Sequence, residues 1–159
     1  SRGLGDVYKR QVIHSGTLGA AFTGRKLKYP PIATSISGRS FEYFESAVLA
    51  TELMLNYVSD NYNENQHSGL VFNVNIPNLP FNEIKDFTFT RLGNRGVPLA
   101  PEFEGDDKTV SYKIGKSGDP DGDLTGTDFE AIMNKNISVT PLFWDMTNLQ
   151  KVKGKLPNV

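Results

Sequence analysis

The run Leu-Val-Phe-Asn-Val-Asn-Ile at residues 70–76 is the clearest strand signal in the chain, and Pro77 and Pro80 end it. Apolar, β-branched runs of this length are typical of a strand in the core of a sheet. Asn73 and Asn75 are two positions apart, so both side chains point to the same face. These amides either form a polar network at one end of the sheet or bond to loop backbone.

Further strands and helices alternate on both sides of this run. The expected strands cover residues 32–36, 86–92 and 137–142, and the expected helices cover 18–22, 41–59 and 128–134. Ser15 or Thr17 caps the first helix, which Gly24 stops. The long helix begins after Ser40, and its predicted apolar stripe consists of Phe41, Phe44, Val48, Met54, Leu55 and Val58. Strands that alternate with helices predict an α/β fold.

The composition excludes several classes of protein function. The 159 residues carry 17 Lys+Arg and 18 Asp+Glu, a net charge of -1, which excludes a strongly basic nucleic-acid binder. The absence of cysteine excludes disulfides, thiolate zinc sites and cysteine nucleophiles. Only His14 and His67 are present, too few for a histidine-rich metal site. No apolar run approaches the roughly 20 residues that span a bilayer.

The tripeptide Ser15-Gly16-Thr17 opens the first expected helix. The first N–H groups of a helix have no intrahelical partner and carry a partial positive charge, so an anion can bind there. A glycine lets a phosphate approach the backbone, and two hydroxyls flank it as further donors. The same tripeptide is also an ordinary helix N-cap, and the residues alone leave both interpretations open.

Several other polar residues are candidates for a site. His14, directly before the tripeptide, is a possible second-shell donor or acid, or a histidine with no chemical role. Arg91 and Arg95, on either side of Gly93, either contact an anion or form structural pairs. A calcium loop is a further hypothesis, with the spacing of its ligands supplied by Asp119, Asp121, Asp123 and Glu130, although Leu124 stands where such loops have glycine. The alternative is a solvated turn in which Thr127 and Glu130 form a capping box.

Three further segments are expected to lie outside the sheet and its helices. Residues 1–11 (SRGLGDVYKRQ) resemble translated sequencing-adapter DNA, so we expect the native sequence to begin near Val12. The turn signal at 105–108 lies between two extended runs and predicts a β-hairpin. Residues 115–126 are rich in glycine and aspartate and are expected to form a loop.

Five blocks of the sequence, in the same order, resemble the SurE family (survival protein E), which consists of metal-dependent 5′/3′-nucleotidases. The blocks are residues 12–24 (VIHSGTLGAAFTG), 29–35 (YPPIATS), 72–77 (FNVNIP), 90–93 (TRLG), and 126–128 with 138–142 (GTD and SVTPL). The resemblance implies a three-layer α/β fold with helices on both faces of the sheet and a protruding β-hairpin arm. It also implies phosphate binding by Ser15, Gly16 and Thr17, with His14, Asn73 and Arg91 as possible second-shell residues.

Family members hold Mg²⁺ or Mn²⁺ on an Asn-Asp-Asp-Gly motif upstream of these blocks. By resemblance, residues 12–159 would be the C-terminal part of such a nucleotidase, without metal ligands of its own and inactive alone. The whole protein would hydrolyse nucleoside monophosphates with a metal-activated water. The alternative from the residues is a catalytically silent module that binds anions or forms oligomers.

The resemblance extends to assembly and location. It implies a homodimer or homotetramer in the cytoplasm, with residues 96–114 as the hairpin arm and 143–159 as a C-terminal tail. Neither a nucleic-acid polymer nor a membrane is an expected partner.

Overall fold

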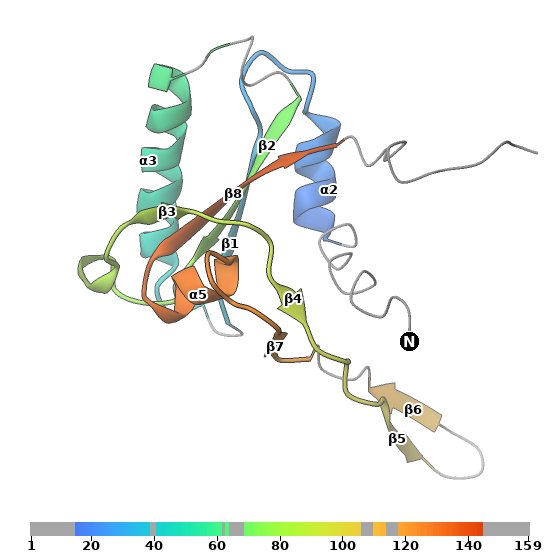
Figure 1. The fold of residues 1–159 in the computed structure, drawn as a ribbon. Helices are drawn as coiled ribbons and strands as arrows, with labels where there is room; N and C mark the ends of the chain where they lie inside the picture. The colour runs from blue at the N-terminus through green and yellow to red at the C-terminus, as the bar shows by residue number, and fades with distance from the viewer. Residues whose placement is uncertain are drawn as a thin grey trace, which may run out of the picture.

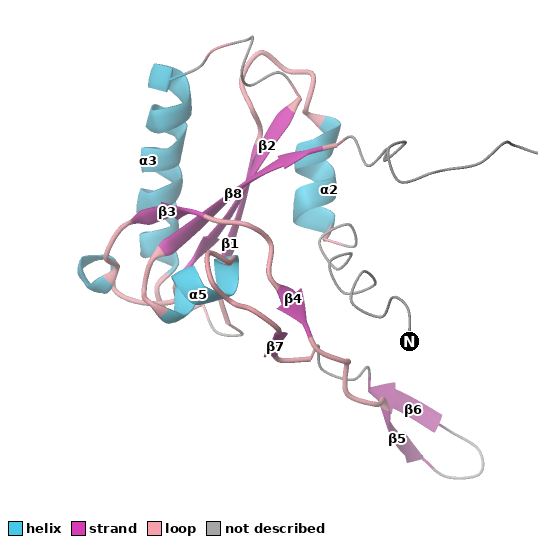
Figure 2. Cartoon of the chain, in the orientation of Figure 1, coloured by secondary structure: helices cyan, strands magenta, loops and turns pink. Residues whose placement is uncertain are grey.

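A computed structural model describes residues 15–38, 41–61, 63, 69–105, 110–113 and 118–144. Its centre is a four-stranded mixed sheet in the order β1-β2-β8-β3 (Figures 1 and 2). The strands are β1 (Ile32–Ile36), β2 (Leu70–Ile76), β8 (Ile137–Phe143) and β3 (Phe87–Phe89). β1 runs parallel to β2, β8 lies antiparallel to β2, and β3 runs parallel to β8.

Helices cover both faces of this sheet, so the predicted three-layer α/β arrangement is confirmed. Helix α3 (Phe44–Asn61) packs on one face, and helices α2 (Gly16–Thr23) and α5 (Asp128–Met133) lie on the other (Figure 1). The larger core lies under α3 and consists of Ala47, Ala50, Met54, Val58, Leu70, Phe72, Val74, Ile76, Ile137 and Val139. A smaller core lies under α2 and consists of Leu18, Phe22, Ala33 and Val71.

Helix α3 differs from its prediction in both its start and its buried side. It begins at Phe44 rather than at 41, because residues 42–43 form a turn in which the Tyr43 N–H bonds to Asn78 Oδ1 (3.2 Å). The predicted cap, Ser40, lies outside the described residues. Small residues at 46, 47 and 50 face the sheet, so the predicted stripe is only partly buried; its exposed members are Phe41, Phe44, Val48 and Leu55.

The two shorter helices begin as their capping residues predict. The Ser15 hydroxyl accepts from the Leu18 N–H (3.3 Å), and Gly24 ends α2. The Thr127 hydroxyl accepts from the Glu130 N–H (3.2 Å) at the start of α5. The Glu130 carboxylate reaches back to the Gly126 N–H (2.6 Å), one residue before the cap.

Strand β3 is shorter than the predicted 86–92, since the chain leaves the sheet after Phe89. Arg91 then forms an isolated bridge with Thr127. A short 3-10 helix, η2 (Phe81–Glu83), precedes β3 and has no counterpart in the prediction.

The predicted hairpin is present and extends away from the sheet (Figure 1). Its strands β5 (Glu102–Gly105) and β6 (Val110–Lys113) pair antiparallel. Closer to the sheet, β4 (Asn94–Arg95) and β7 (Pro120–Asp121) form a second two-stranded ladder. Both hairpin strands fall within the predicted arm, 96–114, while the turn at 106–109 lies outside the described residues.

Parts of other predictions also lie outside the described residues. They concern residues 1–11, His14, His67 and most of the tail, of which only Phe143 and Trp144 are described. Within the described part of the chain, no helix is both long and apolar enough to cross a membrane.

Candidate phosphate-binding site

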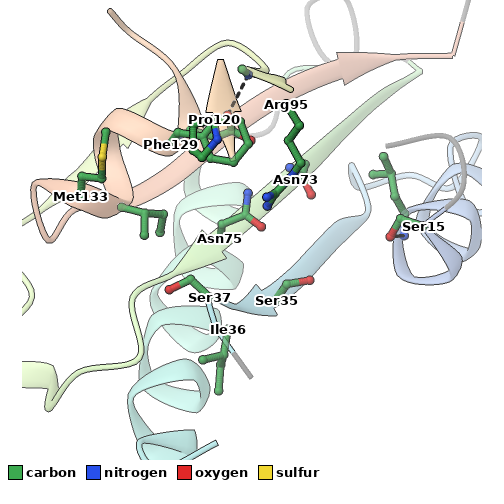
Figure 3. Close-up of a pocket in the computed structure, with 15 residues that line it drawn as sticks. Ser15, Ser35, Ile36, Ser37, Asn73, Asn75, Arg95, Pro120, Phe129 and Met133 are labelled. Atoms are coloured by element: carbon green, nitrogen blue, oxygen red, sulfur yellow. Dashed lines mark hydrogen bonds between the residues drawn. The ribbon is translucent and has the colours of Figure 1, made fainter. Parts of the chain in front are cut away.

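A cavity of about 570 Å³ opens on the face of the sheet that carries α2 and α5 (Figure 3). Three regions supply its polar lining: the start of α2, the ends of β1 and β2, and the segments around β4 and α5. The polar lining residues are Ser15, Ser35, Ser37, Asn73, Asn75, Arg95 and Asp128. Leu18, Ile36, Phe129, Ile132 and Met133 supply apolar wall.

Strand alternation places the amides in this cavity. On β2, Val74 and Ile76 face α3, so Asn73 and Asn75 face the opposite side, which is the cavity side. The register of β1 on β2 sets Ser35 beside Asn75. The polar network predicted for the two asparagines therefore lies within a cavity that also contains serine hydroxyls.

The N-terminus of α2 borders the same cavity through Ser15. The first helical bond of α2 is from the Gly19 N–H to the Ser15 carbonyl (2.8 Å), so the N–H groups of Gly16 and Thr17 precede it. Apart from its chain neighbours and the backbone of its own helix, no atom of the described residues lies within 4 Å of where a Cβ on Gly16 would stand. Gly16 and Thr17 are exposed at this helix end and are not among the residues that line the cavity.

The two arginines near Gly93 point to different places. Arg91 donates to the Asp123 carbonyl (2.9 Å) and lies 3.7 Å from its carboxylate, outside the cavity. Arg95 lines the cavity, with its guanidinium carbon 4.8 Å from the centre of the Phe129 ring. Of the predicted site residues, the structure thus brings Ser15 and Asn73 into one cavity and directs Arg91 elsewhere.

The acidic side chains do not form a metal site among the described residues. Asp119, Asp121, Asp123 and Glu130 belong to no group of three potential metal-ligating residues in that part of the chain. The calcium hypothesis is therefore wrong: the Glu130 carboxylate bonds to Gly126, and Asp123 accepts from the Thr125 N–H (2.9 Å). These bonds serve the loop and the start of α5.

Hydrogen bonding in this loop also changes the pKa of Asp123. The Thr125 backbone N–H, followed by the Thr125 side chain, holds the pKa of Asp123 below its ordinary value, and the charge of Arg91 adds to this. The carboxylate is exposed and does not line the cavity. The shift therefore belongs to the loop and gives no sign of catalytic chemistry.

The donors of the cavity suit an anion better than a cation. Serine hydroxyls, asparagine amides and a guanidinium can all donate hydrogen bonds to phosphate oxygens. The single carboxylate of the lining, Asp128, accepts from the N–H groups of Gly93 (2.8 Å) and Phe129 (3.1 Å) through one oxygen. The described residues thus do not provide the carboxylate cluster that Mg²⁺ or Mn²⁺ prefers.

Comparison with known proteins supports this assignment of the fold. The family described as "Survival protein SurE" matches residues 4–98. The chain belongs to the SurE family. A SurE protein from Aquifex aeolicus has a similar structure, with a TM-score of 0.67 and 32% sequence identity, over 94% of this chain and 58% of that one.

Relatives in this family are named as nucleotidases. The 5′-nucleotidase SurE of Ruthia magnifica subsp. Calyptogena magnifica is 38% identical over 149 residues, which cover 94% of this chain and 57% of that protein. The 5′/3′-nucleotidase SurE of Klebsiella pneumoniae (strain 342) is 37% identical over 146 residues, covering 91% and 54% respectively. The chain spans little more than half the length of these relatives.

The sequence left several cavity residues unnoticed. Ser35 could have been predicted from the register of the two parallel strands. It lies two residues after Ala33, so both side chains face the same side of the sheet as Asn73. Ser37, Asp128 and Phe129 gave no comparable signal. Phe129 reaches the cavity because α5 packs beside the loop at Gly93, a contact between distant parts of the chain.

Proposed function

We propose that this chain forms the phosphate-binding side of a 5′/3′-nucleotidase that hydrolyses the phosphomonoester of nucleoside monophosphates. The observation that carries the proposal is the cavity in which the start of α2, Asn73 and Ser35 come together in a SurE-family chain. In this proposal Ser15 and the backbone N–H groups of Gly16 and Thr17 bind the phosphate. Asn73 supports them from β2, and His14, which directly precedes Ser15 in the chain, is proposed to act beside them. Arg91 bonds to Asp123 outside the cavity and is not part of this proposal.

The divalent ion of this reaction, Mg²⁺ or Mn²⁺, is a separate part of the proposal. Such an ion polarises the phosphoryl oxygen and lowers the pKa of a bound water. The described residues do not fit it, because the acidic side chains among them do not cluster. We therefore assign to this chain the binding and orientation of the phosphate.

A second candidate function is binding without turnover. The same scattering of carboxylates among the described residues favours it, because the donors present can hold a phosphate without activating a water. The exposed apolar residues Val97 and Leu99, which lead into the hairpin, fit an additional role in assembly. We propose a homodimer or homotetramer in the cytoplasm, with neither nucleic acid nor membrane as a partner.

Titration of the 159-residue chain with AMP, with and without Mn²⁺, tests the proposal. We expect AMP to bind and no phosphate to be released. Thr17→Val is expected to weaken AMP binding about fivefold, the value of one neutral hydrogen bond. Thr23→Val is the matched control: it removes an exposed hydroxyl from the other end of α2, where Thr23 bonds only to the Gly19 carbonyl (3.1 Å).

Each outcome of this titration decides a different point. Absence of AMP binding would contradict the proposed function. Clear Mn²⁺-dependent release of phosphate by the chain would contradict the separation of phosphate binding from metal binding. An equal loss of affinity in both threonine variants would show that α2 acts through its stability rather than through its N-terminus.

A further inference from the structure

Arg95 is the one residue with a permanent positive charge among the described residues that line the cavity. We propose that Arg95 is a specificity-determining residue that binds the phosphate of the substrate from β4, on the other side of the ligand from α2. Figure 3 shows its side chain reaching into the cavity toward Asn73, with Ser15 across the cavity. This assignment rests on the proposed function and adds to it a charge that selects phosphomonoesters over neutral nucleosides.

The guanidinium of Arg95 is held in place before any ligand arrives. It stacks on Phe129 at 4.8 Å, and its Nη1 donates to the Gly118 carbonyl (3.2 Å). The backbone of Arg95 pairs with Pro120 in the ladder of β4 and β7. A guanidinium has five N–H donors, so one bond to Gly118 leaves donors for an anion. A side chain already ordered loses less entropy on binding than a free one.

The ring under Arg95 is fixed by a close approach of two segments. A Cβ on Gly93 would stand 2.3 Å from Cδ2 of Phe129, so the ring lies directly against the Gly93 backbone. The Gly93 N–H also bonds to Asp128 Oδ1 (2.8 Å). The loop before β4 and the first turn of α5 are thus joined by a packing contact and a hydrogen bond, and together they set the position of Arg95.

Charge favours phosphate as the ligand of this arginine. The hydroxyls and amides of the cavity are neutral, and Asp128 adds a negative charge to its lining. A phosphate dianion there needs a cation to offset both its own charge and that of the carboxylate. Charge-assisted hydrogen bonds from a guanidinium to phosphate are roughly twice as strong as neutral ones. A neutral nucleoside has no such requirement.

The test measures dissociation constants of the 159-residue chain for inorganic phosphate, AMP and adenosine by NMR titration of backbone amides. Arg95→Gln is expected to weaken binding of phosphate and AMP about tenfold and to leave adenosine binding unchanged. Arg25→Gln is the matched control. Arg25 also stacks on an aromatic ring, Trp144 (5.1 Å), and donates to a carbonyl, that of Phe22 (2.9 Å), but does not line the cavity.

The outcomes separate this assignment from the proposed function. Weaker AMP binding with unchanged phosphate binding in Arg95→Gln would overturn it, because the arginine would then serve the nucleoside. Unchanged affinities in Arg95→Gln, while Thr17→Val loses affinity, would overturn Arg95 alone and leave the proposed function intact. Failure of the unaltered chain to bind either phosphate or AMP would overturn both. If Arg95→Gln does not give a folded spectrum, Arg95→Met replaces it, because methionine is uncharged and can still pack on the Phe129 ring. An unchanged phosphate affinity in Arg95→Met would overturn the assignment.

Discussion

The two faces of strand β2 differ in what they contact, although the same seven residues form both. On one face, Leu70, Phe72, Val74 and Ile76 are buried under α3. On the other, Val71 is buried under α2, while Asn73 and Asn75 line the cavity. The comparison shows that one strand can be a core element and a site element at once, because its side chains alternate. Substitutions on the two faces should therefore change different measured quantities.

The largest expected effect is on the core face. Ile76→Ala removes a fully buried side chain (0% exposed) and should lower the free energy of unfolding by about 2–5 kcal/mol. Asn75→Ala, at the neighbouring position, is the matched variant. It should lower the free energy of unfolding by less than about 1 kcal/mol and weaken phosphate binding instead. Urea unfolding measures the first quantity and phosphate titration the second. Equal losses of stability in the two variants would contradict the division between the faces.

A smaller effect is expected where the cavity wall is tightly packed. Gly93→Ala places a methyl group 2.3 Å from Phe129 Cδ2 and 3.0 Å from Asp128 Oδ1, which forces the ring to move. We expect a loss of about 1–3 kcal/mol in the free energy of unfolding and weaker phosphate binding through Arg95.

Gly19→Ala is the control for this substitution. No atom lies within 4 Å of its Cβ position, and the residue is inside α2, so a gain of about 0.5–1 kcal/mol is expected. Thermal unfolding of both variants measures the difference. A stable Gly93→Ala variant with unchanged phosphate affinity would show that the ring does not position Arg95.

Local signals were enough to predict β1 and β2, but not the short ladder of β4 and β7, whose second strand lies in the expected loop 115–126. The bounds of β1 and β2 agree with the prediction because prolines flank both runs and β-branched residues fill them. The sidedness of α3 was predicted less well. Its sequence has apolar residues on more than one side, and packing chose the side with Ala47 and Ala50, since small residues let the helix approach the sheet.

The site was predictable only in the part that alternation and capping determine. Asn73 follows from the strand period, and Ser15 follows from its place at a helix start. The choice of Arg95 over Arg91 for the cavity depends on Phe129, which comes from a helix far along the chain. A contact between such distant residues cannot be predicted from a local sequence pattern. The roles of His14, Gly16 and Thr17 stay predictions that binding measurements must test.

The smallest expected effect concerns Asp123, which lies in the loop before α5 and on neither face of β2. The Thr125 N–H lowers the pKa of Asp123 from its ordinary value of 3.8, so the ionised carboxylate stabilises the folded state above that value. This contribution is lost as the pH falls through the lowered pKa. Asp123→Asn should therefore unfold at a slightly lower temperature than the unaltered chain at pH 7, and this difference should close as the pH falls below 3.8. The effect stays small because the carboxylate is exposed and screened by water.

Thermal melts between pH 7 and pH 2 measure this effect, and Asp119→Asn, an exposed carboxylate of the same loop, is the matched control. Phosphate affinity at pH 7 should be the same in Asp123→Asn as in the unaltered chain, because Asp123 does not line the cavity. A gap that widens on acidification would contradict the direction of the shift. A loss of phosphate affinity would show that Asp123 reaches the cavity through its partner Arg91, and would give that arginine the second-shell role that the sequence predicts.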